Sequence, residues 1–211
     1  MSSAVNEFPL FPLGIVALPG EVVPLHIFEQ RYKTMIERCL ASDGEFGIVW
    51  LSEGGLREIG CACRIDRVLE RTDDGEMDIL AVGTRPIRIL ERQGHLPYPA
   101  AVVEFVEDRG ERSDPEVAQA ARASYGELLR QATGREPDGA ELERLGAYEM
   151  AATVDLGLDA KQGLLDLRSE NARLRLLGRL LRAALERLQL AEHAHERAMS
   201  NGKVRFGGSA S

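Results

Sequence analysis

The chain has 211 residues, of which 44% are hydrophobic and 28% are charged. This composition is typical of a globular protein with one large or two small domains. The formal net charge is −8, and the first 110 residues contribute −7 of it, with 11 basic and 18 acidic side chains. Since nucleic-acid binding usually needs a basic surface, this balance argues against that class for the first half.

Membrane segments, disulfides and metal sites are also not expected. No apolar run approaches the roughly 20 residues of a membrane span, and residues 1–7 do not resemble a signal peptide, so we expect a cytoplasmic protein without membrane contact. The three cysteines, Cys39, Cys61 and Cys63, are an odd and small number, and Cys61 and Cys63 would lie about 7 Å apart in a strand, so no disulfide framework is expected. Neither CxxC nor HExxH occurs, so we predict no metal site and three buried, unreactive thiols.

The first expected elements lie between Phe8 and Leu40. Apolar residues there are interrupted by Pro9, Pro12, Pro19 and Pro24. Proline removes a ladder donor and breaks helices, so we expect two extended segments with edge or bulged character, joined by a Pro19-Gly20 turn. From Phe28 onward, apolar residues recur at intervals of three and four, which predicts one helix. Its apolar face would comprise Phe28, Tyr32, Met35, Ile36, Cys39 and Leu40.

Short strands are expected next. Period-2 and apolar patterns predict them at 46–51, 60–69, 77–82, 85–91 and 100–106. The sequence Asp73-Asp74-Gly75 is a strong hairpin signal. Gly83-Thr84 is expected to interrupt the β-structure and so to separate two strands. Several short strands joined by glycine and aspartate turns indicate a barrel or strongly bent sheet, and the inserted helix should plug one open end.

Helices alone are expected after the charged linker at 108–114. Ser113 to Glu116 combines a capping box with proline at the first helical position. Helices are predicted at 115–132, 140–156, 159–167 and 169–199, followed by a disordered tail at 200–211. Leucines 167, 174, 181 and 188 fall seven apart, so the last helix offers a surface for weak self-association. The predicted fold is therefore α+β, with a β-rich subdomain at 1–108 and a helical bundle at 115–199 that ends in a long helix.

Catalytic motifs are missing from the sequence. GxxxxGK[ST], GxGxxG and GxSxG are all absent, so we predict no phosphate loop, no cofactor and no catalytic residues.

His26 lies between apolar neighbours. We expect His26 to lie at the edge of the core with one ring nitrogen hydrogen-bonded, and we favour this structural role over a functional one.

Several stretches resemble the N-terminal substrate-binding domain of the Lon protease family. They are FPLFPL at 8–13, LPGEVVPLHIFEQRY at 18–32 and FGIV at 46–49, with weaker likeness at 60–65, 83–89 and 161–177. The resemblance implies a PUA-like barrel and a non-enzymatic domain that binds unfolded or tagged polypeptides, without the ATPase and Ser-Lys peptidase modules of that family. An adaptor or chaperone-like role in protein quality control would follow. The PUA-like fold also leaves a nucleic-acid-binding module as the alternative.

A peptide-binding surface is expected in the proline-rich segment. It carries more bulky apolar side chains than one short segment needs for a core, so some of them should be exposed. The candidate residues are Phe11, Leu13, Leu18, Pro19, His26, Phe28 and Tyr32. We expect the site to include the Leu18-Pro19 turn and the groove between the two subdomains, with micromolar affinity. Leu18→Asp is expected to weaken binding without unfolding the protein.

Overall fold

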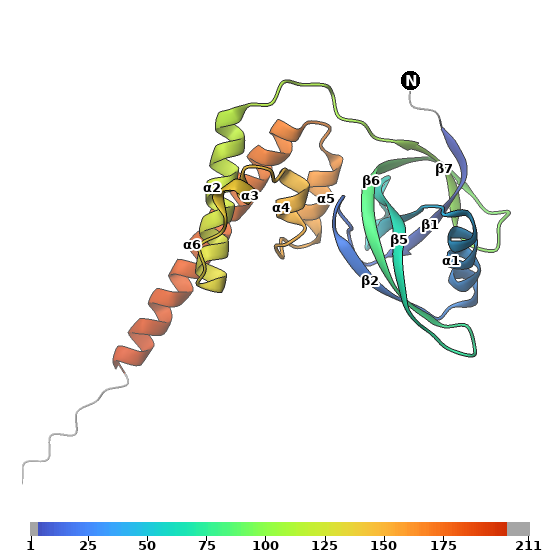
Figure 1. The fold of residues 1–211 in the computed structure, drawn as a ribbon, viewed down its shortest axis with the longest axis horizontal. Coiled ribbons are helices and arrows are strands. Elements are labelled where there is room, and N and C mark those ends of the chain that lie inside the picture. The colour runs from blue at the N-terminus through green and yellow to red at the C-terminus, as the bar shows by residue number, and fades with distance from the viewer. Residues whose placement is uncertain (1–3, 202–211) are drawn as a thin grey trace, which may run out of the picture.

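The computed structural model describes residues 4–201, with seven strands followed by five helices and one helix inserted after the second strand (Figure 1). The strands are β1 (Val5–Leu13), β2 (Val22–Ile27), β3 (Phe46–Ser52), β4 (Gly55–Leu56), β5 (Ile59–Arg71), β6 (Met77–Gln93) and β7 (Ala100–Phe105). The helices are α1 (Gln30–Ser42), α2 (Pro115–Thr133), α3 (Gly139–Leu142), α4 (Ala147–Ala151), α5 (Leu158–Asp166) and α6 (Glu170–Asn201).

The sheet closes on itself. Its strand order is β1-β7-β6-β5-β3-β4, and a parallel pairing between β1 and β3 completes the ring. Residues 5–9 of β1 pair with β7, whereas residues 10–13 pair with β3. Because Pro9 and Pro12 have no amide proton to donate, this division lets a proline-rich strand take part in a closed sheet. β2 pairs only with β6 and carries Pro24 at this edge position. The α+β fold with a bent, closed sheet is thus confirmed.

β6 corrects the prediction of a break at Gly83-Thr84, because it is one continuous strand of 17 residues. A Cβ atom at Gly83 would lie 2.1 Å from the carbonyl oxygen of Leu18. The Gly83 amide donates to the carbonyl of Glu21 at 2.9 Å, and the Gly20 amide donates to the carbonyl of Gly83 at 2.8 Å. The glycine therefore marks a close approach between the β1–β2 loop and β6, which is the other common reason for glycine inside a strand.

The inserted helix, α1, lies beside the barrel on the side away from the helical half (Figure 1). Tyr32, Met35, Ile36 and Cys39 are buried, as the helical period predicts. The prediction was wrong for Phe28 and Leu40, which are exposed. Phe28 precedes the N-cap residue Glu29, so it lies in the extended connection from β2 and does not follow the helical face.

The helical half begins at Pro115 as predicted, but the N-cap residue is Asp114, so the capping box expected from Ser113 to Glu116 was wrong. Asp114 accepts a hydrogen bond from the amide of Val117, and Pro115 is the first residue of α2. The single helix expected at 140–156 was wrong, since two short helices, α3 and α4, occupy this region. The chain turns at Gly146, whose amide donates to Glu149, and the next amide donates to Glu170 of α6. These two carboxylates stabilise a new helix start inside the predicted helix.

The leucine seam of α6 packs mainly against α2 and forms part of the core of the chain. Leu174, Leu177 and Leu181 are buried, whereas Leu167 is the C-cap of α5 and lies outside the seam. α6 extends past the end of α2 (Figure 1), and its residues 186–191 are exposed.

One buried cluster of apolar residues includes members from both halves. At the junction, Lys161 of α5 pairs with Glu21 of the β1–β2 loop, and the side-chain Nε2 of Gln162 donates to the carbonyl of Ile59 at 3.1 Å. Among residues 4–201, all strands lie before residue 106 and all helices except α1 after residue 114. The division into subdomains at 1–108 and 115–199 remains a prediction, and residues 202–211 of the predicted tail lie outside the described residues.

Candidate functional site

A groove of about 560 Å³ opens on the barrel between β1, the β2–α1 connection and the β3–β4 hairpin; we call it the barrel groove. It brings together five of the seven predicted site residues, namely Phe11, Leu13, His26, Phe28 and Tyr32. Its other lining residues are Pro12, Ile27, Glu29, Arg31, Leu51, Leu56, Arg92 and Pro99. The lining is mostly apolar, with charged groups among the aromatic and aliphatic ones.

The barrel groove has buried aromatic residues beneath exposed apolar ones. The rings of Phe11 and Tyr32 are buried and pack with their centroids 4.2 Å apart. Phe28 and Leu51 are 57% and 52% exposed. Phe28 and Leu51 come from segments far apart in sequence, which β3 and the β2–α1 connection bring to one face. The result is a concave surface with uncovered apolar area, which is typical of a binding groove.

The polar groups of the barrel groove are already partly paired. Nδ1 of His26 lies 2.7 Å from a carboxylate oxygen of Asp78, and the ring stacks near Phe28 at 5.8 Å between centroids. The prediction that one nitrogen is satisfied is confirmed, but the position at the edge of the core was wrong because the side chain is exposed. Arg31 pairs with Glu29 at 2.7 Å and lies over the Tyr32 ring. His26 and Arg31 are thus already paired with neighbouring carboxylates.

The structure corrects the placement of the Leu18-Pro19 turn. Leu18 is 0% exposed, and neither Leu18 nor Pro19 lines the barrel groove. The turn folds back onto β6 at Gly83, and the amide of Leu18 donates to the Glu21 carboxylate at 3.0 Å. Because its amide is satisfied, Leu18 can be buried, whereas Pro19 is half-buried and Gly20 is exposed. The expectation that Leu18→Asp leaves the fold intact was therefore wrong, since a buried charge without a partner destabilises strongly.

A second groove, of about 750 Å³, lies where the β3–β4 hairpin meets α5; we call it the junction groove. It is lined by Trp50, Ser52, Glu53, Gly54, Gly55, Leu56, Arg57, Glu58, Ile59, Asp159, Gln162 and Asp166. Leu56 of β4 lines both grooves. A groove between the two halves was expected, but none of its residues was predicted, because 50–59 and 159–166 are far apart in the chain. The single tryptophan, Trp50, was the one local signal.

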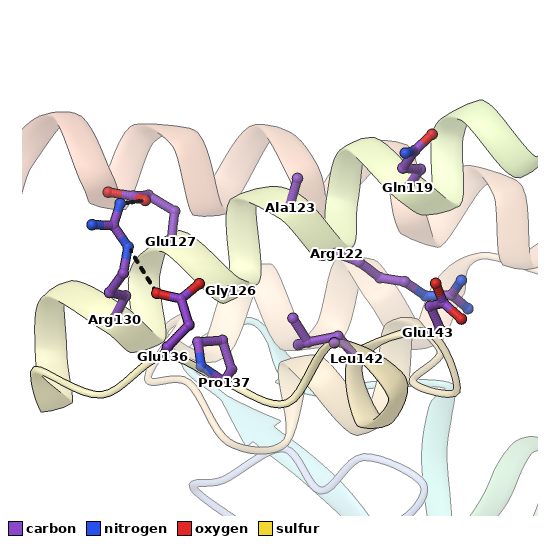
Figure 2. A pocket seen from close by; sticks show the side chains of 11 residues that line it. Gln119, Arg122, Ala123, Gly126, Glu127, Arg130, Glu136, Pro137, Leu142 and Glu143 are labelled. Atoms are coloured by element: carbon purple, nitrogen blue, oxygen red, sulfur yellow. Dashed lines mark hydrogen bonds and ion pairs between the residues drawn. The ribbon is translucent and has the colours of Figure 1, made fainter.

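A third groove, of about 740 Å³, lies between α2 and the segment at 136–143 and contains none of the predicted residues. Figure 2 shows Arg130 on one side of it, paired with both Glu127 and Glu136. Arg130 is thus shared by two carboxylates, and the apolar residues of this groove include Pro137 and Leu142 (Figure 2). These features do not favour any particular ligand.

The thiols are not poised for chemistry. Cys39, Cys61 and Cys63 are all buried, as predicted. Burial raises the pKa of Cys39 to about 11, and the side-chain hydrogen bond with Cys63, together with burial, raises the pKa of Cys61. Since the thiolate is the nucleophile, neither group is reactive at neutral pH. Over residues 4–201 the structure contains no group of three or more His, Cys, Asp or Glu side chains able to hold a metal ion. The same residues include no helix long and apolar enough to span a bilayer.

Comparison with known proteins adds the evolutionary context. The family model described as the ATP-dependent protease La (LON) substrate-binding domain matches residues 7–183. The chain is 26% identical over 202 residues to Lon protease of Anaeromyxobacter dehalogenans and to Lon protease 2 of Myxococcus xanthus. Both alignments cover 87% of this chain but 24% of the relative, so the chain spans about a quarter of these curated relatives.

Solved structures support the same fold. The Lon N-terminal domain protein from Xanthomonas campestris superposes with a TM-score of 0.63 at 23% identity, covering 82% of this chain and 97% of that one. The N-terminal domain of the Mycobacterium avium complex Lon protease gives 0.61 at 22% identity, covering 83% and 98%. At these identities, the comparison establishes the architecture of barrel and helices.

Proposed function

Because the chain belongs to the family of ATP-dependent protease La (LON) substrate-binding domains, we propose that it is a non-enzymatic domain that recognises polypeptides. The observation that carries this proposal is the barrel groove, with Phe28 and Leu51 more than half exposed over a buried aromatic floor. Apolar pockets beside short strand edges are a recurring means of binding extended peptides. The absence of catalytic motifs in the sequence supports a role in binding.

The proposed ligand is an unfolded or tagged polypeptide. A groove of about 560 Å³ falls within the usual range for specific sites, roughly 300–1,000 Å³, and can take a few apolar side chains. Folded proteins bury such side chains, so a groove of this kind selects chains that expose them. An adaptor or chaperone-like role in protein quality control, and a cytoplasmic location, belong to the same proposal.

A nucleic-acid-binding role is less well supported. The first 110 residues carry a net charge of −7, and Arg31 in the barrel groove is already paired with Glu29. Proteins that bind nucleic acid neutralise several phosphates with basic side chains. Binding of single-stranded RNA with a steep dependence on salt would support this alternative instead.

The experiment compares two leucines of equal exposure. Leu51 lines the barrel groove and is 52% exposed, whereas Leu90 on β6 is 50% exposed and lies outside it. Since fully burying a leucine is worth about 1.5–3 kcal/mol, burying the exposed half of Leu51 should contribute about 1 kcal/mol, or roughly fivefold in Kd.

The affinity of a fluorescein-labelled unfolded peptide is measured by anisotropy for wild type, Leu51→Ala and Leu90→Ala. We expect weaker binding for Leu51→Ala alone. Equal effects of the two substitutions would contradict binding in the barrel groove.

A further inference from the structure

The junction groove has a surplus of negative charge. Glu53 and Glu58 contribute from the barrel side, and Asp159 and Asp166 from α5. None of these four carboxylates has an ion-pair partner among the described residues, whereas nearby Glu21 and Glu45 are paired with Lys161 and Arg85. The only cation of the lining is Arg57, whose guanidinium lies 5.0 Å from the centre of the Trp50 ring. The groove therefore presents an uncompensated charge of about −3 to a ligand.

A buried acceptor without a donor lies in the same groove. Gln162 is 4% exposed, and its Nε2 donates to the carbonyl of Ile59 at 3.1 Å and to Asp166 at 2.8 Å. Its Oε1 has no partner within the part of the chain that the structure describes. Exchanging the two amide atoms would set Oε1 against two oxygens, so the acceptor is fixed in this orientation. Buried polar atoms are normally satisfied, so a ligand that donates a hydrogen bond here would supply the partner that this oxygen lacks.

The two grooves adjoin. Leu56 of β4 lines both of them, and β4 pairs only with β3 at the end of the sheet path. A polypeptide whose apolar side chains occupy the barrel groove can therefore continue over β4 and place its next side chains in the junction groove. The apolar lining of the barrel groove and the acidic lining of the junction groove would then contact neighbouring parts of one peptide segment.

We propose that the junction groove binds an arginine or lysine side chain of the polypeptide in the barrel groove, an inference that rests on the function proposed above. A guanidinium or ammonium group supplies the positive charge that the four carboxylates lack, and it supplies N–H donors for the free oxygen of Gln162. An acidic side chain at the same place would be repelled. The substrates selected would be apolar stretches flanked by basic residues.

The test uses three fluorescein-labelled peptides that share an apolar core without tryptophan and differ in two flanking residues, which are Arg, Gln or Glu. They are titrated against wild type and the double variant Glu58→Gln/Asp159→Asn, which removes one charge from each wall of the junction groove. The matched control is Glu116→Gln/Glu186→Gln, which removes two exposed charges outside both grooves. Trp50, the only tryptophan, reports occupancy of the junction groove through its fluorescence.

We expect wild type to bind the Arg peptide about five- to tenfold more tightly than the Gln peptide at low salt, with the Glu peptide weakest. The preference should shrink in high salt, vanish in the junction variant and persist in the control. The Arg peptide alone should change the Trp50 fluorescence.

Equal affinity for the Arg and Gln peptides would overturn this inference, as would a preference that both double variants lose alike. The proposed function would still stand if Leu51→Ala weakened all three peptides. If none of the peptides bound, the proposed function would fail and this inference with it.

Discussion

Replacing Gly83 with alanine should destabilise the protein by about 2–4 kcal/mol. The new Cβ would lie 2.1 Å from the Leu18 carbonyl oxygen and 3.1 Å from Sγ of Cys61, so the β1–β2 loop must move away from β6. That movement breaks the two backbone hydrogen bonds of Gly83 with Gly20 and Glu21, at about 1 kcal/mol each. Overpacking adds about 1–3 kcal/mol. The lower backbone entropy of alanine relative to glycine offsets about 0.5–1 kcal/mol of this loss.

Urea unfolding monitored by circular dichroism measures the effect. Gly94→Ala is the matched control, because a Cβ at Gly94 meets no atom within 4 Å, and its change should stay within about 0.5 kcal/mol. The displaced loop also carries Glu21, the partner of Lys161, so the contact between barrel and α5 should loosen as well. A Gly83→Ala midpoint equal to that of Gly94→Ala would refute the account of a close backbone approach.

Four further predictions concern the helical half and the thiols. Arg173 is buried, binds Asp108, Glu170 and the carbonyl of Leu167, and lies over the Tyr148 ring. Arg173→Lys should therefore lower the free energy of unfolding by about 1–3 kcal/mol, and an unchanged urea midpoint would contradict this. Ellman's reagent should leave the thiols unmodified in native protein at pH 8 and modify them in urea, so a fast native reaction would show an accessible thiol. Because the pKa of Cys39 is raised from 9.0 to about 11, its contribution to stability should be present below pH 9 and decline from there through about pH 11, as the unfolded chain loses the proton first. Leu188 and Leu190 of α6 are exposed, so sedimentation should show weak self-association that Leu190→Lys abolishes; identical behaviour of both proteins would exclude this surface.

Local patterns predicted much of the fold. The hairpin at Asp73-Asp74-Gly75 joins β5 and β6, and Asp114-Pro115 starts α2, because turn and capping chemistry depends on adjacent residues. The buried face of α1 follows from the spacing of Tyr32, Met35, Ile36 and Cys39. In each case the deciding interactions lie within a few residues of one another.

The errors arose where distant residues decide the local structure. Gly83 looks like a strand break, and only the loop from Leu18 to Glu21 explains why β6 continues through it. Likewise, Glu170 of α6 helps to start α4 at Gly146, so the expected single helix is divided. Leu18 is buried because its turn packs onto another strand. None of these contacts leaves a periodic signal in the sequence.

Only the part of the candidate site that comes from residues 8–32 could be predicted from the sequence. The bulky residues of 8–32 pointed to a binding surface, and five of the seven candidates line the barrel groove, although binding there stays a prediction. Leu51 and Leu56 were not identified because they complete the groove from the β3–β4 hairpin. The junction groove combines carboxylates from 53–58 and 159–166, which the sequence separates by about half its length.

The most direct test of polypeptide recognition is to locate a bound peptide by nuclear magnetic resonance. An isotope-labelled sample is titrated with an unlabelled unfolded peptide, and the shifts of backbone and aromatic signals are mapped onto the structure. We predict the largest changes at Phe28, Tyr32 and Leu51, continuing to Leu56. Changes confined to the groove between α2 and the segment at 136–143, or no changes at saturating peptide, would contradict binding at the barrel groove.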